Sequence, residues 1–133
     1  MAASVAVLSG HPQHWELLSA IVLDCGLSPV RCETLAVGTA LLTQEPFEFA
    51  LCEDALPDGD FRGLIAALRR SGRWMPVVVI SRFDDWGSYL EAMVAGAFDY
   101  VAFPPYPREL ERVLDAAFAE SRLHRGTAAT VAA

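Results

Sequence analysis

The sequence contains neither lysine nor asparagine, and all ten basic residues among its 133 residues are arginine. The absence of lysine excludes a lysine Schiff base, a phosphate-loop lysine and a lysine general base. Acidic residues outnumber basic ones by 17 to 10, which gives a net charge of −7. A chain this acidic repels nucleic acid and anionic lipid, so we expect it to bind neither directly.

Cysteine and long hydrophobic runs are also scarce. The three cysteines, Cys25, Cys32 and Cys52, fit no zinc or redox spacing, and we interpret them as reduced, mostly buried thiols. No run approaches the roughly 18 apolar residues of a membrane span. The opening residues MAASVAVLSG lack the basic start of a signal peptide. We therefore expect a cytoplasmic protein that folds around one core.

Short apolar runs alternate with stretches of helical periodicity along the chain. The apolar runs predict five strands, at residues 5–8, 30–34, 47–52, 76–80 and 98–103. The periodic stretches predict helices within residues 15–26, 36–43, 60–72, 84–96 and 110–118. Such alternation predicts a doubly wound, flavodoxin-like α/β fold with a parallel sheet in the order 2-1-3-4-5 and helices on both faces. It spans residues 1–125, and residues 126–133 are expected to form a flexible tail.

In this fold the functional crevice lies at the carboxyl ends of the strands. The segments expected there are residues 9–12, 53–59, 81–84 and 103–105.

Three of these regions resemble one family. FEFALCEDALPDGDFRG (47–63), VVVIS (77–81) and AGAFDYVAFPP (95–105) resemble the receiver domain of bacterial two-component response regulators, and the likeness covers about residues 4–123. The resemblance implies a CheY-like fold, and a site where an acidic pair holds Mg²⁺ and an aspartate is phosphorylated. It also implies a strand-end hydroxyl and lysine that contact the phosphoryl group.

Most of these positions are altered here. The acidic pair falls on Ser9 and Gly10, the phosphoacceptor on Glu53, and the lysine on Phe103. Phosphoryl transfer depends on metal and cation charge, so we expect neither Mg²⁺ binding nor phosphorylation, and no enzymatic activity. Two interpretations of Glu53 stay open: a mimic of phosphorylated aspartate, or a solvated acid at a strand end.

Two positions are retained, the hydroxyl as Ser81 and the aromatic switch position as Tyr100. Ser81 has no base at recognisable spacing, which disfavours a nucleophilic serine. Tyr100 is either a packed aromatic or a switch. Trp86, Tyr89 and Tyr106 lie in the same region and form a candidate interface.

Other polar residues near the crevice have simpler interpretations. Asp54 could replace the phosphoacceptor, but it follows Glu53 directly and should face the other way. Asp58 and Asp60 are expected to be turn and cap residues rather than metal ligands. His11 and His14 could chelate zinc, but a proline lies between them and His14 is expected to open the following helix, so we predict no metal site.

The resemblance further implies a cis peptide bond between Phe103 and Pro104. The Phe103 ring is then expected to cover the former lysine site as a plug.

The favoured function is a pseudo-receiver that binds a protein partner, or a second copy of itself, through the fourth helix, fifth strand and fifth helix. One alternative is a receiver phosphorylated on Glu53 or Asp54. Another is a flavodoxin-like binder of a small molecule, although the loop at residues 9–12 is short for a phosphate site.

Overall fold

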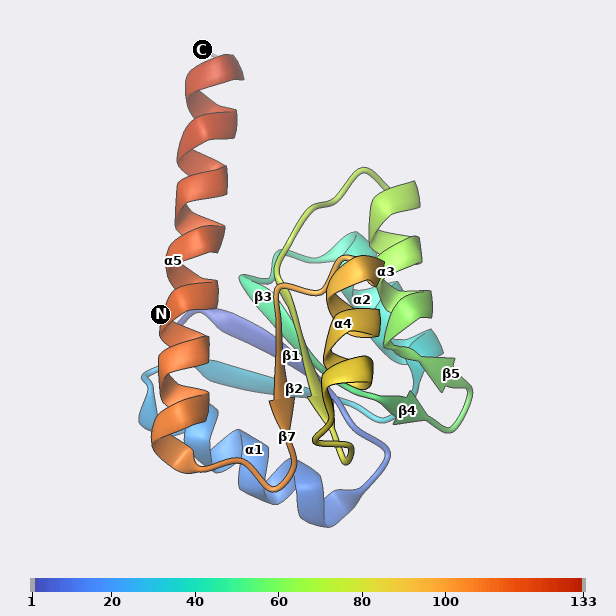
Figure 1. Ribbon diagram of the computed structural model, residues 1–133. Coiled ribbons are helices and arrows are strands. Elements are labelled where there is room, and N and C mark those ends of the chain that lie inside the picture. The colour runs from blue at the N-terminus through green and yellow to red at the C-terminus, as the bar shows by residue number, and fades with distance from the viewer. Residues whose placement is uncertain (1, 133) are drawn as a thin grey trace.

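The computed structural model describes the backbone of residues 2–132 and the side chains of residues 2–125. Within these residues, five parallel strands form the central sheet of Figure 1: β1 (Ser4–Leu8), β2 (Ser28–Cys32), β3 (Phe49–Glu53), β6 (Val77–Ser81) and β7 (Asp99–Ala102). Their order is β2-β1-β3-β6-β7. This is the predicted order, because β6 and β7 are the fourth and fifth strands of the sheet.

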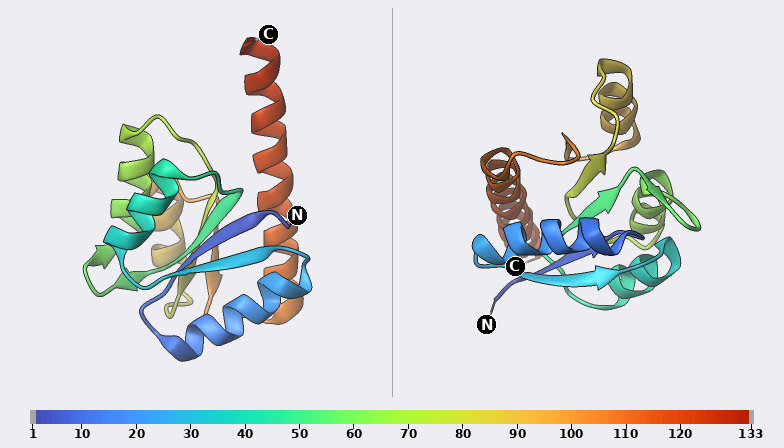
Figure 2. Two further views of the ribbon diagram at one scale, coloured as in Figure 1. Left: turned by 180° about the vertical axis from the view of Figure 1, so that it is seen from behind. Right: turned by 90° about the horizontal axis from the view of Figure 1, so that it is seen from below.

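Helices cover both faces of the sheet, as the two views of Figure 2 show. The elements α1 (Pro12–Asp24) and α5 (Pro107–Ala132) contact one another. The helices α2 (Leu35–Gln44), α3 (Phe61–Arg70) and α4 (Trp86–Ala95) form a contiguous layer, since α3 contacts both α2 and α4.

Alternating side chains of the strands divide the core into two clusters. In β1, Val5 and Val7 belong to the cluster that includes Leu18 of α1, whereas Ala6 and Leu8 belong to the cluster that includes Leu64 of α3. Successive strand residues point to opposite faces, so near-continuous apolar strands are required when helices cover both sides.

Several local boundaries differ from the prediction. The strand β2 lies two residues earlier than expected, and the loop after β3 contains a short hairpin, β4 (Ala55–Leu56) with β5 (Gly59–Asp60). Each strand of this hairpin has two residues, which is too short to produce a sequence pattern.

The first helix also begins earlier than predicted. It starts at Pro12, with His11 as its N-cap, so His14 lies inside the first turn rather than opening the helix. Proline suits the first helical position because its missing N–H would have no helical partner there. As a consequence, His11 and His14 are three residues apart on one side of the helix start.

The last helix runs through residues 126–132, where composition predicts a flexible tail; the flexibility of that segment stays a prediction. In the part of the chain that the structure describes, no helix is long and apolar enough to cross a membrane.

Candidate functional site

The carboxyl ends of β1, β3, β6 and β7 bring the predicted crevice positions to one edge of the sheet. Ser9, Glu53 and Ser81 are all buried there. Each follows or ends a strand of the same parallel sheet, which is why residues far apart in sequence meet at this edge.

The former acidic-pair positions contribute no carboxylate and little space. The Ser9 hydroxyl donates to the His11 carbonyl and accepts from the His11 N–H, both at 3.2 Å. A Cβ atom at Gly10 would lie 3.0 Å from Cδ of Pro57. Ser9 is therefore engaged by the backbone, and Pro57 crowds any larger side chain at Gly10.

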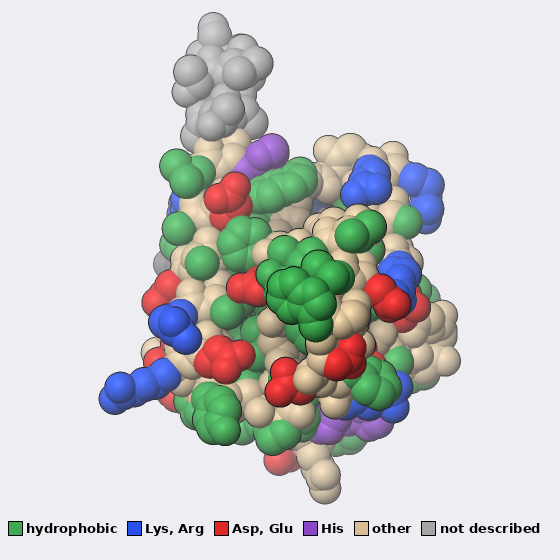
Figure 3. Space-filling model, in the orientation of Figure 1, with side chains coloured by type: hydrophobic (Ala, Val, Ile, Leu, Met, Phe, Trp, Pro, Cys, Tyr) green, Lys and Arg blue, Asp and Glu red, His purple; other side chains and the backbone are tan. Residues whose placement is uncertain are grey.

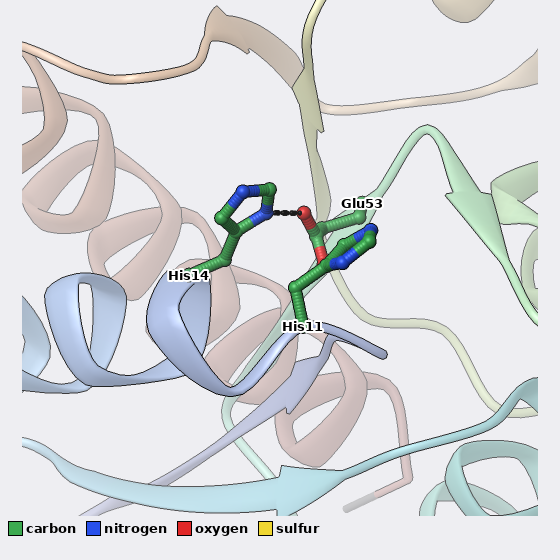
Figure 4. Close-up of side chains that lie close together, drawn as sticks. All are labelled: His11, His14 and Glu53. Carbon is green, nitrogen blue, oxygen red and sulfur yellow. Dashed lines mark hydrogen bonds and ion pairs between the residues drawn. The ribbon is translucent and has the colours of Figure 1, made fainter.

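Glu53 is buried, with 5% of its surface exposed, so its interpretation as a solvated strand-end acid is wrong. The Nδ1 atom of His14 lies 2.5 Å from Oε1 of Glu53, and the two atoms share a hydrogen bond (Figure 4). The other oxygen, Oε2, is buried and has no hydrogen-bond partner among the described residues. The sequence pattern does not predict this pair, although Pro12, as a helix start, is a signal that His14 faces the crevice.

His11 completes a group of three side chains at this point. Its ring centroid lies 4.6 Å from that of His14, and Figure 4 shows both rings beside the Glu53 carboxylate. One donor atom from each of the three side chains lies within 4.8 Å of the other two. His11 is exposed and His14 is half-buried, so the group is open to solvent on the histidine side.

Phe103 takes the lysine position and contacts this group. The Phe103 and His14 ring centroids lie 4.0 Å apart with the planes tilted by 33°. The predicted cis peptide between Phe103 and Pro104 is confirmed. At the lysine position, the Phe103 ring thus packs directly on the imidazole of His14.

Asp54 faces away from the histidines, as predicted. Its Oδ2 atom accepts from Nε of Arg82 at 3.1 Å. Asp54, Ser81 and Tyr100 share the lining of a small hollow of about 160 Å³. The Ser81 hydroxyl accepts from the Phe83 N–H at 3.0 Å.

The two loop acids cap helices, which confirms their interpretation. The Asp58 carboxylate accepts from the N–H groups of Leu35 and Ala36 at 2.7 and 2.9 Å, and these bonds lower the pKa of its carboxyl. Asp60 accepts from the Arg62 N–H at the start of α3.

The cysteines are unpaired, and burial raises the pKa of each thiol. For Cys32 the pKa rises to about 11. Cys32 and Cys52 are buried and Cys25 is half-buried, which agrees with the interpretation of mostly buried thiols, and few of them are ionised near neutral pH.

Aromatic side chains line a second, larger feature, which we term the α4–β7 groove. The Trp86 and Tyr89 rings stack with centroids 5.2 Å apart, and Tyr89 meets the Tyr100 ring edge-on at 6.0 Å. The Tyr100 hydroxyl donates to the Phe83 carbonyl at 2.5 Å. Tyr100 is thus bonded and packed in this structure.

The groove has a volume of about 670 Å³, and its lining includes the acidic residues Asp84, Asp85 and Glu109. Trp86 and Tyr106, at its edge, are 70% and 78% exposed. Figure 3 shows hydrophobic side chains gathered over α4 with acidic side chains beside them. Large exposed aromatics of this kind are typical of interaction surfaces.

The crevice suits Mg²⁺ poorly. Mg²⁺ prefers oxygen ligands in octahedral geometry, often one or two carboxylates with water. Here the carboxylate of Glu53 is hydrogen-bonded to an imidazole. At the two acidic-pair positions, Ser9 offers only a hydroxyl and Gly10 has no side chain. The donors that gather are two imidazoles and one carboxylate, a set that Mg²⁺ does not favour.

The sequence of the chain is similar to those of response regulators. No family profile matches the sequence. The chain is 26% identical over 98 residues, 74% of its length, to the response regulator protein PilR of Pseudomonas aeruginosa, and covers 22% of that protein. It is 33% identical over 69 residues, 52% of its length, to the two-component response regulator PhoP of the same organism, and covers 31% of it.

The folds of solved receiver domains superpose closely on this chain. The receiver domain of the Francisella response regulator 1452 superposes with a TM-score of 0.82 at 17% identity, over 90% of this chain and 98% of that one. The receiver domain of the sensor histidine kinase PA1611 from Pseudomonas aeruginosa, which holds a magnesium ion in its active-site cleft, gives 0.80 at 18% identity over 90% and 99%.

The fold is therefore that of the CheY-like response regulator receiver domain. The chain spans about a fifth to a third of the length of the curated relatives that it matches.

Proposed function

We propose that the chain is a phosphorylation-independent receiver domain, a cytoplasmic protein-interaction module in a bacterial two-component or phosphorelay pathway. Its similarity to response regulators supports the pathway. One observation carries the rest: the carboxylate at the phosphoacceptor position belongs to Glu53, is buried, and is bonded to His14.

The chemistry of phosphoryl transfer supports this proposal. An attacking carboxylate must meet an anionic donor, and metal ions and cations lower the barrier to that encounter. At this site Ser9 and Gly10 supply no carboxylate that could bind a metal ion, and Phe103 supplies no cation. Losing each such contact costs on the order of 3 kcal/mol of transition-state stabilisation, so their combined loss leaves no useful rate.

The α4–β7 groove is the proposed binding surface. The aromatic side chains that line the groove can bury apolar side chains of a partner, and the acidic side chains that line it favour neighbouring basic residues. We therefore propose a partner segment with an apolar anchor flanked by arginine or lysine. A second copy of the chain is the other occupant to be tested.

Mass spectrometry after incubation with acetyl phosphate and Mg²⁺ tests the phosphorylation claim. We expect no adduct on the wild-type chain and no Mg²⁺-dependent change in tryptophan fluorescence with beryllofluoride. The triple variant Ser9→Asp, Glu53→Asp, Phe103→Lys restores three functional groups and is expected to gain a Mg²⁺-dependent adduct. A stoichiometric adduct on wild-type Glu53 or Asp54 would refute the proposal.

A matched tryptophan pair tests the binding surface. Trp86→Ala removes an exposed aromatic from the groove, whereas Trp74→Ala removes one elsewhere on the surface. In affinity capture from the native host, we expect Trp86→Ala to lose the partner and Trp74→Ala to retain it. Sedimentation of the purified chain distinguishes a second copy from another protein. Equal retention by both variants would exclude the groove.

A second candidate function rests on Asp54. Its side chain is 18% exposed and paired with Arg82, and it shares a hollow with the retained Ser81. These features favour Asp54 over Glu53 as an alternative phosphoacceptor. This alternative predicts an adduct that Asp54→Asn abolishes and Glu53→Gln does not.

A further inference from the structure

We propose that His11, His14 and Glu53 form a binding site for a divalent transition-metal ion of the Zn²⁺ class. The proposal goes beyond the interaction function and does not depend on it. It revises the expectation of no metal site, which assumed that His14 opened the first helix.

The placement of the three side chains comes from two elements. His11 caps α1 and His14 lies in its first turn, so both rings project from one helix start toward the end of β3. Glu53 ends β3, and its carboxylate lies beside both rings (Figure 4). A rigid helix and a buried strand thus hold two nitrogen ligands and one oxygen ligand at one point.

The donor atoms lie on either side of the spacing that an ion of this class requires. Tetrahedral donors about 2.0–2.1 Å from Zn²⁺ lie roughly 3.3 Å from each other. Here the donor atoms all lie within 4.8 Å of one another, and the His14–Glu53 pair is 2.5 Å apart. To bind an ion, His14 and Glu53 must move apart toward that spacing, and the charge of the ion then takes the place of their hydrogen bond.

The charge of Glu53 independently points to a cation. Its side chain is nine-tenths buried or more, and Oε2 has no partner within the described part of the chain. A buried carboxylate is costly unless a positive charge and hydrogen bonds compensate it. Phe103 replaces the cation that the receiver resemblance implies at this edge. Among the described residues, the two imidazoles gather at Glu53, where as neutral ligands they can hold a positive ion against its carboxylate.

The donor set selects the metal class. Two imidazoles with one carboxylate suit Zn²⁺ and other late first-row ions, whereas Mg²⁺ and Ca²⁺ require oxygen ligands. Because His11 is exposed, a fourth position on the ion is open to water or to a donor from another molecule. Phe103 packs on His14 and restricts the rotation of that ring.

Metal titration of the intact chain tests the proposal. We expect native mass spectrometry and calorimetry to show one Zn²⁺ per chain, and Co²⁺ to give visible d–d bands without a thiolate charge-transfer band. His11→Ala, His14→Ala and Glu53→Gln should each weaken Zn²⁺ binding by about 100-fold or more, since outer-sphere changes alone cost about 10–100-fold. Zn²⁺ should also raise the melting temperature of the wild type but not of His11→Ala.

The controls keep the outcome unambiguous. His124→Ala and Cys25→Ser remove potential ligands far from the crevice and should leave affinity within about twofold, as surface changes do. His11 is exposed, so its variant tests the site without threatening the fold. Three results would overturn the proposal: no saturable Zn²⁺ binding, a loss of Zn²⁺ affinity in His124→Ala as large as in the site variants, or a thiolate band with Co²⁺. None of these readouts depends on phosphorylation or on a partner.

Discussion

At the scale of single residues, the pair of His14 and Glu53 is the least expected feature of the molecule. A strand-end acid at the edge of a parallel sheet is normally solvated, yet Glu53 is buried beneath the start of α1. His14 supplies the partner that makes this burial tolerable. Removing one member of the pair should therefore lower the free energy of unfolding by more than removing both members.

A double-mutant cycle measures this coupling. In the presence of a chelator, we expect His14→Ala to lower the free energy of unfolding by about 2 kcal/mol, because it leaves a buried carboxylate unpaired. Adding Glu53→Gln should recover part of the loss, with a coupling energy of about 1 kcal/mol or more. Urea unfolding provides the measurement, and His124→Ala should stay within about 0.5 kcal/mol of the wild type. Strict additivity would contradict the pairing.

At the scale of secondary-structure elements, α2 depends on a close approach to the sheet. A Cβ atom at Gly38, in the middle of α2, would lie 2.3 Å from Cδ2 of Leu8. Leu8 is fully buried in β1, where packed interiors leave side chains little room to move. The glycine lets the helix backbone lie directly on a strand side chain.

Replacing a glycine inside a helix by alanine usually stabilises the helix, but at Gly38 we expect the opposite. Gly38→Ala gains up to about 1 kcal/mol of helix propensity, but overpacking against Leu8 costs about 1–3 kcal/mol. We expect a net loss of stability in thermal unfolding. Gly87→Ala in α4 is the matched control, because its Cβ would meet only the Asp85 carboxylate, at 3.3 Å. A stabilised Gly38→Ala variant would show that α2 can move away from the sheet.

The start of α2 is capped from another element. Asp58 lies in the turn of the β4–β5 hairpin and accepts two N–H groups of α2. These bonds lower the pKa of the Asp58 carboxyl. Because the folded pKa lies below the unfolded one, the stability that Asp58 contributes is present above the unfolded pKa and is lost as pH falls through the folded pKa.

Acid titration of Asp58→Asn checks this assignment. The wild type should be more stable than the variant near neutral pH, and the difference should shrink below about pH 4, the ordinary range of an aspartate. Denaturant unfolding at a series of pH values gives the comparison. Asp24→Asn, at the exposed end of α1, should show no such trend; an unchanging Asp58 difference would count against the cap.

At the scale of the whole molecule, net charge and surface shape act together. The chain carries a net charge of −7, and Asp84, Asp85 and Glu109 place acidic side chains around the α4–β7 groove. Long-range attraction should therefore bring a basic partner segment to the groove, while the aromatic side chains hold it there.

Salt dependence separates these two contributions. For the captured partner, we expect the association rate to fall by roughly tenfold between low and high salt, with little change in the dissociation rate. Asp84→Asn with Glu109→Gln should weaken the salt effect, whereas Glu33→Gln, which lies outside the groove, should not. Stopped-flow or surface-based kinetics measures both rates. Salt-independent association would indicate an uncharged partner.

Much of the architecture was determined by the sequence alone. Apolar strands of about five residues, alternating with periodic helices, allow only a parallel sheet covered on both faces, because each apolar face must be buried. The positions of Ser9, Glu53, Ser81 and Phe103 at one edge follow from that topology. So does the opposite orientation of Asp54, since neighbouring strand residues point to opposite sides.

Only the tertiary structure decided how the crevice side chains meet. The burial of Glu53, its bond to His14 and the approach of His11 depend on where α1 starts and how it packs against β1 and β2. The Asp58 cap and the contact between Gly38 and Leu8 likewise join residues more than twenty positions apart. Sequence patterns record the period and polarity of each element, whereas such contacts depend on the positions of packed elements to within an ångström or so, because packed interiors leave little free space.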